Sequence, residues 1–196
     1  MYYRDIILAV QRSDQLHFMR ELVTILHEKH DQHQCALSFP QWKEGTPNRM
    51  DTVDPYVCHA ELGTVVRLFS ATEAPLEAIE RVLEIEAVVR AGHLQLTQVK
   101  RVPTGCSGAA FCRVRSADGL NRRLRRAGDA DRRQRLRDDF RAQGHKLAHL
   151  QMLDKHGRTS RPLYLTKVSA DQVSQVIQTN SFGLSPQKAP CFLPDF

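Results

Sequence analysis

The chain has 196 residues, and its 28 basic side chains outnumber its 22 acidic ones to give a net charge of +6. The hydrophobic fraction of 41% is that of a folded protein and excludes wholesale disorder. No run of about eighteen apolar residues is present, which excludes a transmembrane helix. We expect a cytoplasmic protein, because residues 1–10 lack a secretory signal core and the five irregularly spaced cysteines indicate reduced thiols.

Residues 1–102 alternate between strand and helix patterns. Runs rich in β-branched and aromatic residues predict strands at 2–10, 35–39, 64–70 and 93–102. One helix is expected from residue 14 to 30 with Ser13 as its cap, and another from Pro75 to Gly92. Apolar residues with helical spacing form the expected buried stripes, which are Leu16, Met19, Leu22, Val23 and Leu26, then Leu76, Ile79, Val82, Leu83 and Val88. This order predicts an α+β fold that begins with a ferredoxin-like βαββαβ domain.

A change of character follows the glycine- and proline-containing segment 103–108, which we predict to be a linker between domains 1–102 and 109–196. A strand over 109–115 would place Arg113 and Arg115 on one face, because they are two residues apart. An arginine-rich helix and a second helix to about residue 145 are expected next. They are followed by a β-hairpin whose strands are at 148–153 and 161–168, and by an irregular tail at 180–196. Residues 41–59 are predicted to form a long loop.

The most distinctive segment is the arginine run Leu120-Asn-Arg-Arg-Leu-Arg-Arg-Ala127. At about 100° per residue, its two leucines and Ala127 lie on one side of a helix, and the opposite side carries Arg122, Arg125 and Arg126. The run offers few acidic partners, and unpaired like charges on one face repel. A nucleic-acid partner would relieve that repulsion through its phosphates, whereas the alternative is an ordinary solvated face.

His27 is the candidate for acid–base chemistry. It lies at the flank of the first helix's apolar stripe, where a side chain can rest on the core and still face a ligand. The helix C-terminus favours the protonated ring, and an ordinary pKa near 6.5 suits proton transfer. The alternative is a histidine with no catalytic role.

A metal site is a further alternative, because His27, His30, His33 and Cys35 are close in sequence and could supply zinc ligands. The helix is expected to end near His30, and no glutamate is placed as in metalloprotease motifs, so we expect no metal and no other cofactor. Phosphate-binding loops, nucleophile elbows and dinucleotide fingerprints are also missing from the sequence, which argues against nucleotide hydrolysis, acyl transfer and hydride transfer.

Four short motifs occur in order along nearly the whole chain. They are Leu26-His27 at the end of the first helix, Ser38-Phe39-Pro40 on the next strand, Arg113-Val-Arg115 before the arginine helix, and Ser181-Phe-Gly-Leu-Ser185 near the carboxyl end. Together they resemble the repeat-RNA endoribonuclease of type I-F CRISPR systems. That family pairs an amino-terminal ferredoxin-like domain with a carboxyl-terminal arginine-helix domain.

The resemblance implies a role for each matching residue. His27 matches the histidine that deprotonates a ribose 2′-hydroxyl, and Arg113 matches an arginine that recognises a guanine at the base of an RNA hairpin. Arg115 stands where the family often has a glutamine that recognises the adjacent base. The helix that enters the hairpin's major groove is matched by Arg122, Arg123, Arg125 and Arg126.

Three departures from the family pattern concern the active site. Phe182 replaces a tyrosine and lacks its hydroxyl, and Arg161 stands near the place of an aromatic residue that stacks under the terminal base pair. The family's catalytic serine has no counterpart in residues 149–154. The groups that could take over its role are His149, Lys155, His156 and Ser160, and the sequence does not choose among them.

The resemblance implies cleavage without a metal, in which the 2′-hydroxyl attacks the adjacent phosphate and leaves a 2′,3′-cyclic phosphate. It also implies that the protein stays bound to the mature guide RNA as a subunit of the type I-F effector complex, with no membrane partner. The first alternative is a non-cleaving RNA-binding subunit that caps a guide-RNA hairpin, which Phe182 and the missing serine favour. The second is a basic protein that packages DNA or structured RNA without hairpin preference.

Overall fold

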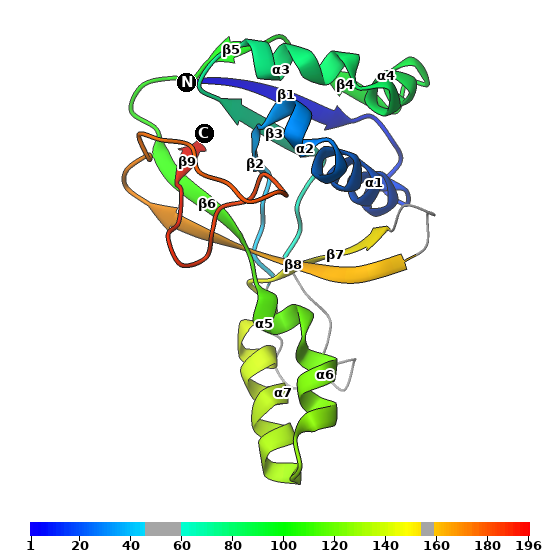
Figure 1. Cartoon of the computed structure of the whole chain (residues 1–196), viewed down its shortest axis with the longest axis vertical. Helices are drawn as coiled ribbons and strands as arrows, with labels where there is room; N and C mark the ends of the chain where they lie inside the picture. The colour runs from blue at the N-terminus through cyan, green and yellow to red at the C-terminus, as the bar shows by residue number, and fades with distance from the viewer. Residues whose placement is uncertain (46–59, 154–158) are drawn as a thin grey trace.

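The computed structural model describes residues 1–45, 60–153 and 159–196, without the side chains of 153 and 159–161. It confirms the α+β class: two antiparallel sheets carry several helices (Figure 1). The expected loop over 41–59 lies largely outside the described residues, and residues 154–158, between the two strands of the expected hairpin, lie wholly outside them. No helix in the described part of the chain is long and apolar enough to cross a membrane.

The first sheet comes from the amino-terminal half of the chain. Its strands are β1 (Tyr2–Leu8), β2 (Ala36–Ser38), β3 (Val65–Ser70), β4 (Leu94–Leu96) and β5 (Lys100–Arg101). They lie in the order β2-β3-β1-β4, with β5 also paired to β1, and every pairing is antiparallel. The strand predicted over 93–102 is therefore two short strands that pair with different parts of β1.

In the described part of the chain, four α-helices accompany this sheet, namely α1 (Gln15–Glu28), α2 (His30–His33), α3 (Ala74–Ala78) and α4 (Leu83–Arg90). The predicted cap was wrong: Asp14, not Ser13, is the N-cap of α1, and its side chain makes no capping hydrogen bond. Leu16 was also misplaced, since it is 65% exposed. At about 100° per residue, Leu16 lies roughly 70° around the helix axis from the centre of the buried stripe that the other four predicted residues form.

The second predicted helix is interrupted. A short 3₁₀ turn, η1 (Ile79–Arg81), follows α3, and Val82 is extended with ψ 110° before α4 begins. This break resets the helical phase, so Leu83 is 75% exposed and Ile85 is buried in its place.

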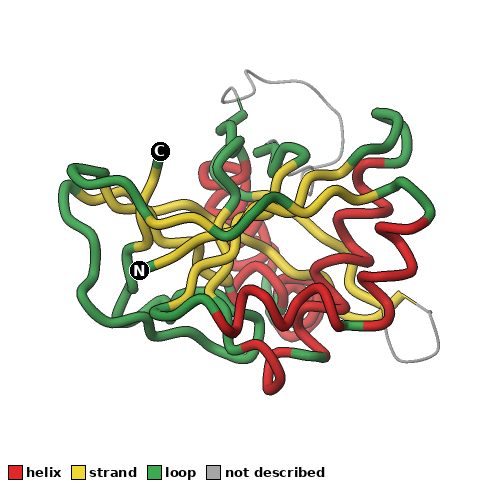
Figure 2. Tube along the Cα trace, turned by 90° about the horizontal axis from the view of Figure 1, so that it is seen from above, coloured by secondary structure: helices red, strands yellow, loops and turns green. Residues whose placement is uncertain are grey.

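The second sheet comes from the carboxyl-terminal half. Its strands are β6 (Ser107–Arg113), β7 (Ala148–Leu153), β8 (Thr159–Ala170) and β9 (Leu193–Asp195), in the order β7-β8-β6-β9. The β7–β8 hairpin confirms the two predicted strands. The tail predicted to be irregular contributes β9, which pairs with the start of β6. Both ends of the chain lie on the same side of the molecule (Figure 2), where the rings of Tyr3 and Phe196 are in contact.

Three helices project from the second sheet (Figure 1): α5 (Arg115–Asp118), α6 (Leu120–Arg126) and α7 (Ala130–Gly144). The strand expected to reach Arg115 ends at Arg113, so these two arginines do not share a strand face. The reason is the apolar spacing: Val114, Ala117 and Leu120 are all buried in one cluster and recur every three residues, which is a helical period.

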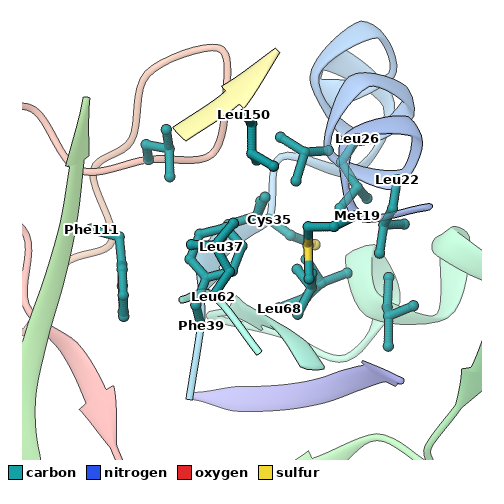
Figure 3. Close-up of a cluster of buried hydrophobic side chains, with 14 of the residues drawn as sticks. Met19, Leu22, Leu26, Cys35, Leu37, Phe39, Leu62, Leu68, Phe111 and Leu150 are labelled. Atoms are coloured by element: carbon teal, nitrogen blue, oxygen red, sulfur yellow. The ribbon is translucent and has the colours of Figure 1, made fainter. Parts of the chain in front are cut away.

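The main hydrophobic core joins the two sheets. Met19, Leu22 and Leu26 on α1 point toward Leu37 and Phe39 near β2 (Figure 3), and Leu150 of β7 and Phe111 of β6 belong to the same cluster. The rings of Phe39 and Phe111 meet edge to face with centroids 5.3 Å apart. The end of α1, β2 and the second sheet are therefore held in one packed unit.

Candidate active site

His27 lies in the last turn of α1 and is half-buried. Its Nδ1 is 2.8 Å from the main-chain oxygen of Ser181. A carbonyl oxygen only accepts hydrogen bonds, so Nδ1 carries the hydrogen and donates it. In the neutral ring this leaves the lone pair on Nε2, which is the nitrogen able to accept a proton from a ligand.

Phe182 covers the ring of His27. The two rings stack with centroids 3.6 Å apart and planes 10° apart. The guanidinium carbon of Arg113, at the end of β6, is 5.2 Å from the centroid of the same phenyl ring. The structure thus brings together three of the predicted site residues from the ends of α1, β6 and the carboxyl-terminal tail.

The segment that carries Phe182 is a tight turn held by its own hydrogen bonds. Asn180 Oδ1 accepts from the main-chain N–H of Phe182 at 2.9 Å and from that of Leu184 at 3.3 Å. Gly183 has φ +67°, and a Cβ there would lie 2.2 Å from Leu37 Cδ1. Because the turn approaches β2 this closely, only glycine fits at this position without rearrangement.

Main-chain hydrogen bonds fix this turn between the two sheets. The N–H of Leu37 in β2 donates to the oxygen of Gly183 at 2.8 Å, and the N–H of Ser185 donates to the oxygen of Phe111 in β6 at 2.9 Å. Ser185 is buried, and its hydroxyl oxygen accepts from the N–H of Cys191. The motif Ser181-Phe-Gly-Leu-Ser185 therefore positions the two groups that orient His27, which are the main-chain oxygen of its first residue and the phenyl ring of its second.

Arg113 has a partner that the sequence did not predict. Its Nε is 2.7 Å from Oδ2 of Asp118, at the end of α5, and both side chains are mostly buried. The sequence signal that could have indicated this pair is an acidic residue, Asp118, five positions after Arg113 in a segment rich in arginine. Neither helix nor strand periodicity predicts such a pair, because it spans the junction between the two.

The arginine helix has the predicted amphipathic form. Leu120, Leu124 and Ala127 are buried, and Arg122, Arg123, Arg125 and Arg126 are all exposed. None of these four arginines forms an ion pair with a residue that the structure describes. Four neighbouring cations on one short helix make a strongly positive surface suited to a polyanion.

The remaining predicted residues lie elsewhere or outside the described part. Arg115 is exposed in the first turn of α5. The side chains of Arg161 and Ser160 in β8, and the residues Lys155 and His156, lie outside the described residues. His149 stacks on Tyr164 with ring centroids 4.9 Å apart, and burial lowers its pKa.

The metal alternative meets an obstacle at His33. Its Nε2 lies 2.9 Å from the oxygen of Leu26, and its Nδ1 accepts from the N–H of Cys35. Both ring nitrogens are therefore in use within the protein. Burial also raises the pKa of the Cys35 thiol to about 12, which opposes the thiolate that a metal needs. Within the described part of the chain, no group of three or more potential metal-binding side chains is present.

Comparison with known proteins agrees with the motif order. The family model described as CRISPR-associated protein (Cas_Csy4) matches residues 3–196, which includes both sheets and the projecting helices. No curated protein matches the chain.

Proposed function

The chain belongs to the Cas_Csy4 family, the endoribonucleases that process precursor guide RNA in type I-F CRISPR systems, and we propose that it cleaves the repeat hairpin at its 3′ base without a metal ion. The observation that carries this proposal is the hydrogen bond from His27 Nδ1 to the oxygen of Ser181. It leaves Nε2 of a half-buried imidazole as a base, on a ring stacked against Phe182, whose own ring contacts the guanidinium of Arg113.

The proposed reaction needs little from the protein beyond positioning and proton transfer. Nε2 of His27 removes the proton from the ribose 2′-hydroxyl, and the oxygen attacks the adjacent phosphorus in line. The bond to the 5′-oxygen breaks and that oxygen takes up a proton from water, which yields a 2′,3′-cyclic phosphate and a 5′-hydroxyl, while the protonated His27 returns its proton to solvent. Because the RNA supplies its own nucleophile, one well-oriented histidine is sufficient for the first proton transfer.

The arginines are proposed to bind the hairpin in two ways. Arg122, Arg123, Arg125 and Arg126 hold phosphates from the exposed face of α6, and their lack of described ion-pair partners supports that role. Arg113 and Arg115 recognise bases at the foot of the stem. Arg161 is proposed to stack under the terminal base pair, and Phe182 supports the ring of His27.

The domain division and the partners also belong to this proposal. We propose that residues 1–102 form a ferredoxin-like domain, for which the order β2-β3-β1-β4 and its antiparallel pairings are support. Residues 109–196 are proposed to be the RNA-binding domain, joined by 103–108, although the last two residues of that segment already belong to β6. The protein is proposed to stay on the mature guide RNA and to join the other subunits of the type I-F effector complex.

The test compares parent, His27→Ala and His17→Ala on a repeat hairpin RNA in EDTA. His17 is a matched control, since it is an exposed histidine on the same helix. We expect His27→Ala to lose at least about 10²-fold in cleavage rate and to keep its RNA affinity, while His17→Ala behaves as the parent. Unchanged cleavage by His27→Ala would disprove its role as the base.

Two other outcomes identify the alternatives. Tight hairpin binding without cleavage by the parent would identify a non-cleaving cap on the guide RNA, which the lack of a serine in residues 149–154 favours. Equal affinity for unrelated duplexes would identify a packaging protein.

A further inference from the structure

The carboxylate of Asp118 connects Arg113 to the second sheet. Its Oδ2 accepts from Nε of Arg113 at 2.7 Å, and its Oδ1 accepts from the main-chain N–H of Tyr164 in β8 at 3.2 Å. The side chains of Asp118 and Arg113 are only 12% and 22% exposed. A charge-assisted bond in such partial burial is stronger than one in water.

Asp118 is itself held rigidly. The N–H of Val114 donates to the oxygen of Tyr164 at 2.8 Å, so the same residue of β8 binds both ends of the segment from Val114 to Asp118. Val114, Ala117 and Tyr164 also share one hydrophobic cluster. The carboxylate is therefore a fixed feature of the fold.

The bond to Asp118 selects which edge of the guanidinium remains available. Arginine has five N–H donors, and Nε supplies one of them. Among the described residues, Arg113 makes no other hydrogen bond, so both terminal nitrogens are free to donate. Two such nitrogens match the O6 and N7 acceptors of guanine, which is the commonest specific contact in a major groove.

This pairing distinguishes Arg113 from the arginines of α6. The latter are exposed and have no described ion-pair partner, which suits phosphates at variable positions. Recognition of one base instead requires a guanidinium held in one orientation, because ordering a long side chain upon binding reduces affinity. The contact of Arg113 with the ring of Phe182 restricts it further.

We propose that Asp118 is a positioning residue that holds Arg113 in the orientation required to recognise one guanine at the foot of the hairpin stem. This inference rests on the proposed function, in which Arg113 contacts a base. Asp118 itself does not touch the RNA, and its effect passes through Arg113 alone.

The experiment measures competition binding of hairpins that carry each of the four base pairs at every stem position. We expect the parent to prefer guanine at one position by roughly 5- to 150-fold, and Arg113→Ala to lose that preference. Asp118→Ala should lose it to a similar degree while its salt dependence stays that of the parent. The double variant should lose no more than Arg113→Ala, because the two residues act as one unit.

Two further variants test whether a loss of base preference comes from lost positioning of Arg113 or from a change in net charge or folding. Asp138→Asn removes the same charge from an exposed aspartate beside Arg141, and it should keep the full preference. Asp118→Asn keeps one carbonyl oxygen for its two donors, so its preference should lie between those of the parent and Asp118→Ala. Thermal unfolding of each variant identifies any that is not folded, and the preference is compared among the folded ones.

The outcomes distinguish this inference from the function on which it rests. If Asp118→Asn and Asp118→Ala keep the preference while Arg113→Ala loses it, the inference is overturned and base recognition by Arg113 stands. If the parent shows no preference at any stem position, both are overturned.

Discussion

The imidazole of His27 and the phenyl ring of Phe182 lie nearly parallel, with centroids 3.6 Å apart. The main-chain oxygen of the preceding residue, Ser181, accepts the hydrogen of His27 Nδ1. Two adjacent residues of the tail thus determine both the plane of the imidazole and its tautomer. A base whose lone pair must point at one hydroxyl depends on both.

Replacing Phe182 should therefore affect cleavage more than binding. Phe182→Leu removes the stacked ring but keeps apolar volume, and an aromatic pair is worth about 0.5–1.5 kcal/mol. We expect a cleavage rate lower by about 2- to 10-fold in single-turnover assays, with RNA affinity within about twofold of the parent. Phe182→Tyr keeps the ring and is the control, so a loss of equal size in both variants would contradict this account.

The exposed arginines of α6 should dominate the electrostatic part of affinity. Arg122→Ala, Arg125→Ala and Arg126→Ala should each weaken hairpin binding by roughly 1 kcal/mol and reduce the slope of log affinity against log salt by about one. The matched control is Arg90→Ala, an exposed arginine on α4 at the opposite end of the molecule (Figure 1). Binding by the triple variant as tight as that of the parent would show that this helix does not contact RNA.

Arg115 should contribute sequence preference, because it lies exposed at the start of α5, close in sequence to Arg113. Arg115→Gln should move the preference at one stem position from guanine toward adenine, with a change of about 1–3 kcal/mol. Arg123→Gln is the comparison, and it should weaken binding to all hairpins alike. If every base pair is bound equally by the parent, the arginines contact phosphates only.

Gly183 should be intolerant of any side chain. In Gly183→Ala the new Cβ would lie 2.7 Å from the oxygen of Cys35 as well as against Leu37. Backbone strain and overpacking together should lower the free energy of unfolding by roughly 2–5 kcal/mol in urea titration. Gly92→Ala isolates the strain alone, since Gly92 has φ +78° and no atom within 4 Å of an added Cβ. Its expected loss is only about 1–2 kcal/mol.

His33 should make the protein less stable in mild acid. Burial lowers the pKa of His33 below its ordinary value of 6.5, and its Nδ1 must stay unprotonated to accept from Cys35. Below pH 6.5 the unfolded chain therefore binds a proton that the folded chain does not, and the free energy of unfolding falls as pH decreases through that value. The slope from one such group is at most about 1.4 kcal/mol per pH unit.

The measurement is urea unfolding between pH 7.5 and about pH 5. Burial also lowers the pKa of His30 and His149, which adds to the slope in the same direction. His33→Gln should be less stable at neutral pH and should show a shallower slope below pH 6.5. A parent whose stability does not change over this range would contradict the prediction.

Local periodicity was a sound guide where one face of an element meets the core. It predicted the buried face of the arginine helix and the strands of the β7–β8 hairpin. It failed at junctions: Leu83 is exposed because the chain is extended at Val82, and Arg115 opens a helix instead of continuing β6. At such a junction, the residues before and after it do not share one hydrophobic repeat. Packing against distant parts of the chain then decides where each helix or strand ends.

The sequence by itself determined the α+β class, the family and the positions of the charged groups, because spacing and side-chain chemistry are local properties. Only the tertiary structure decided which of those groups meet. The stack of His27 on Phe182 depends on the packing of α1, β2, β6 and the tail into one core. The bond from Arg113 to Asp118 depends on the packing of α5 against Tyr164 of β8. Each such contact joins elements whose relative placement results from burial over the whole molecule, and no local pattern encodes it.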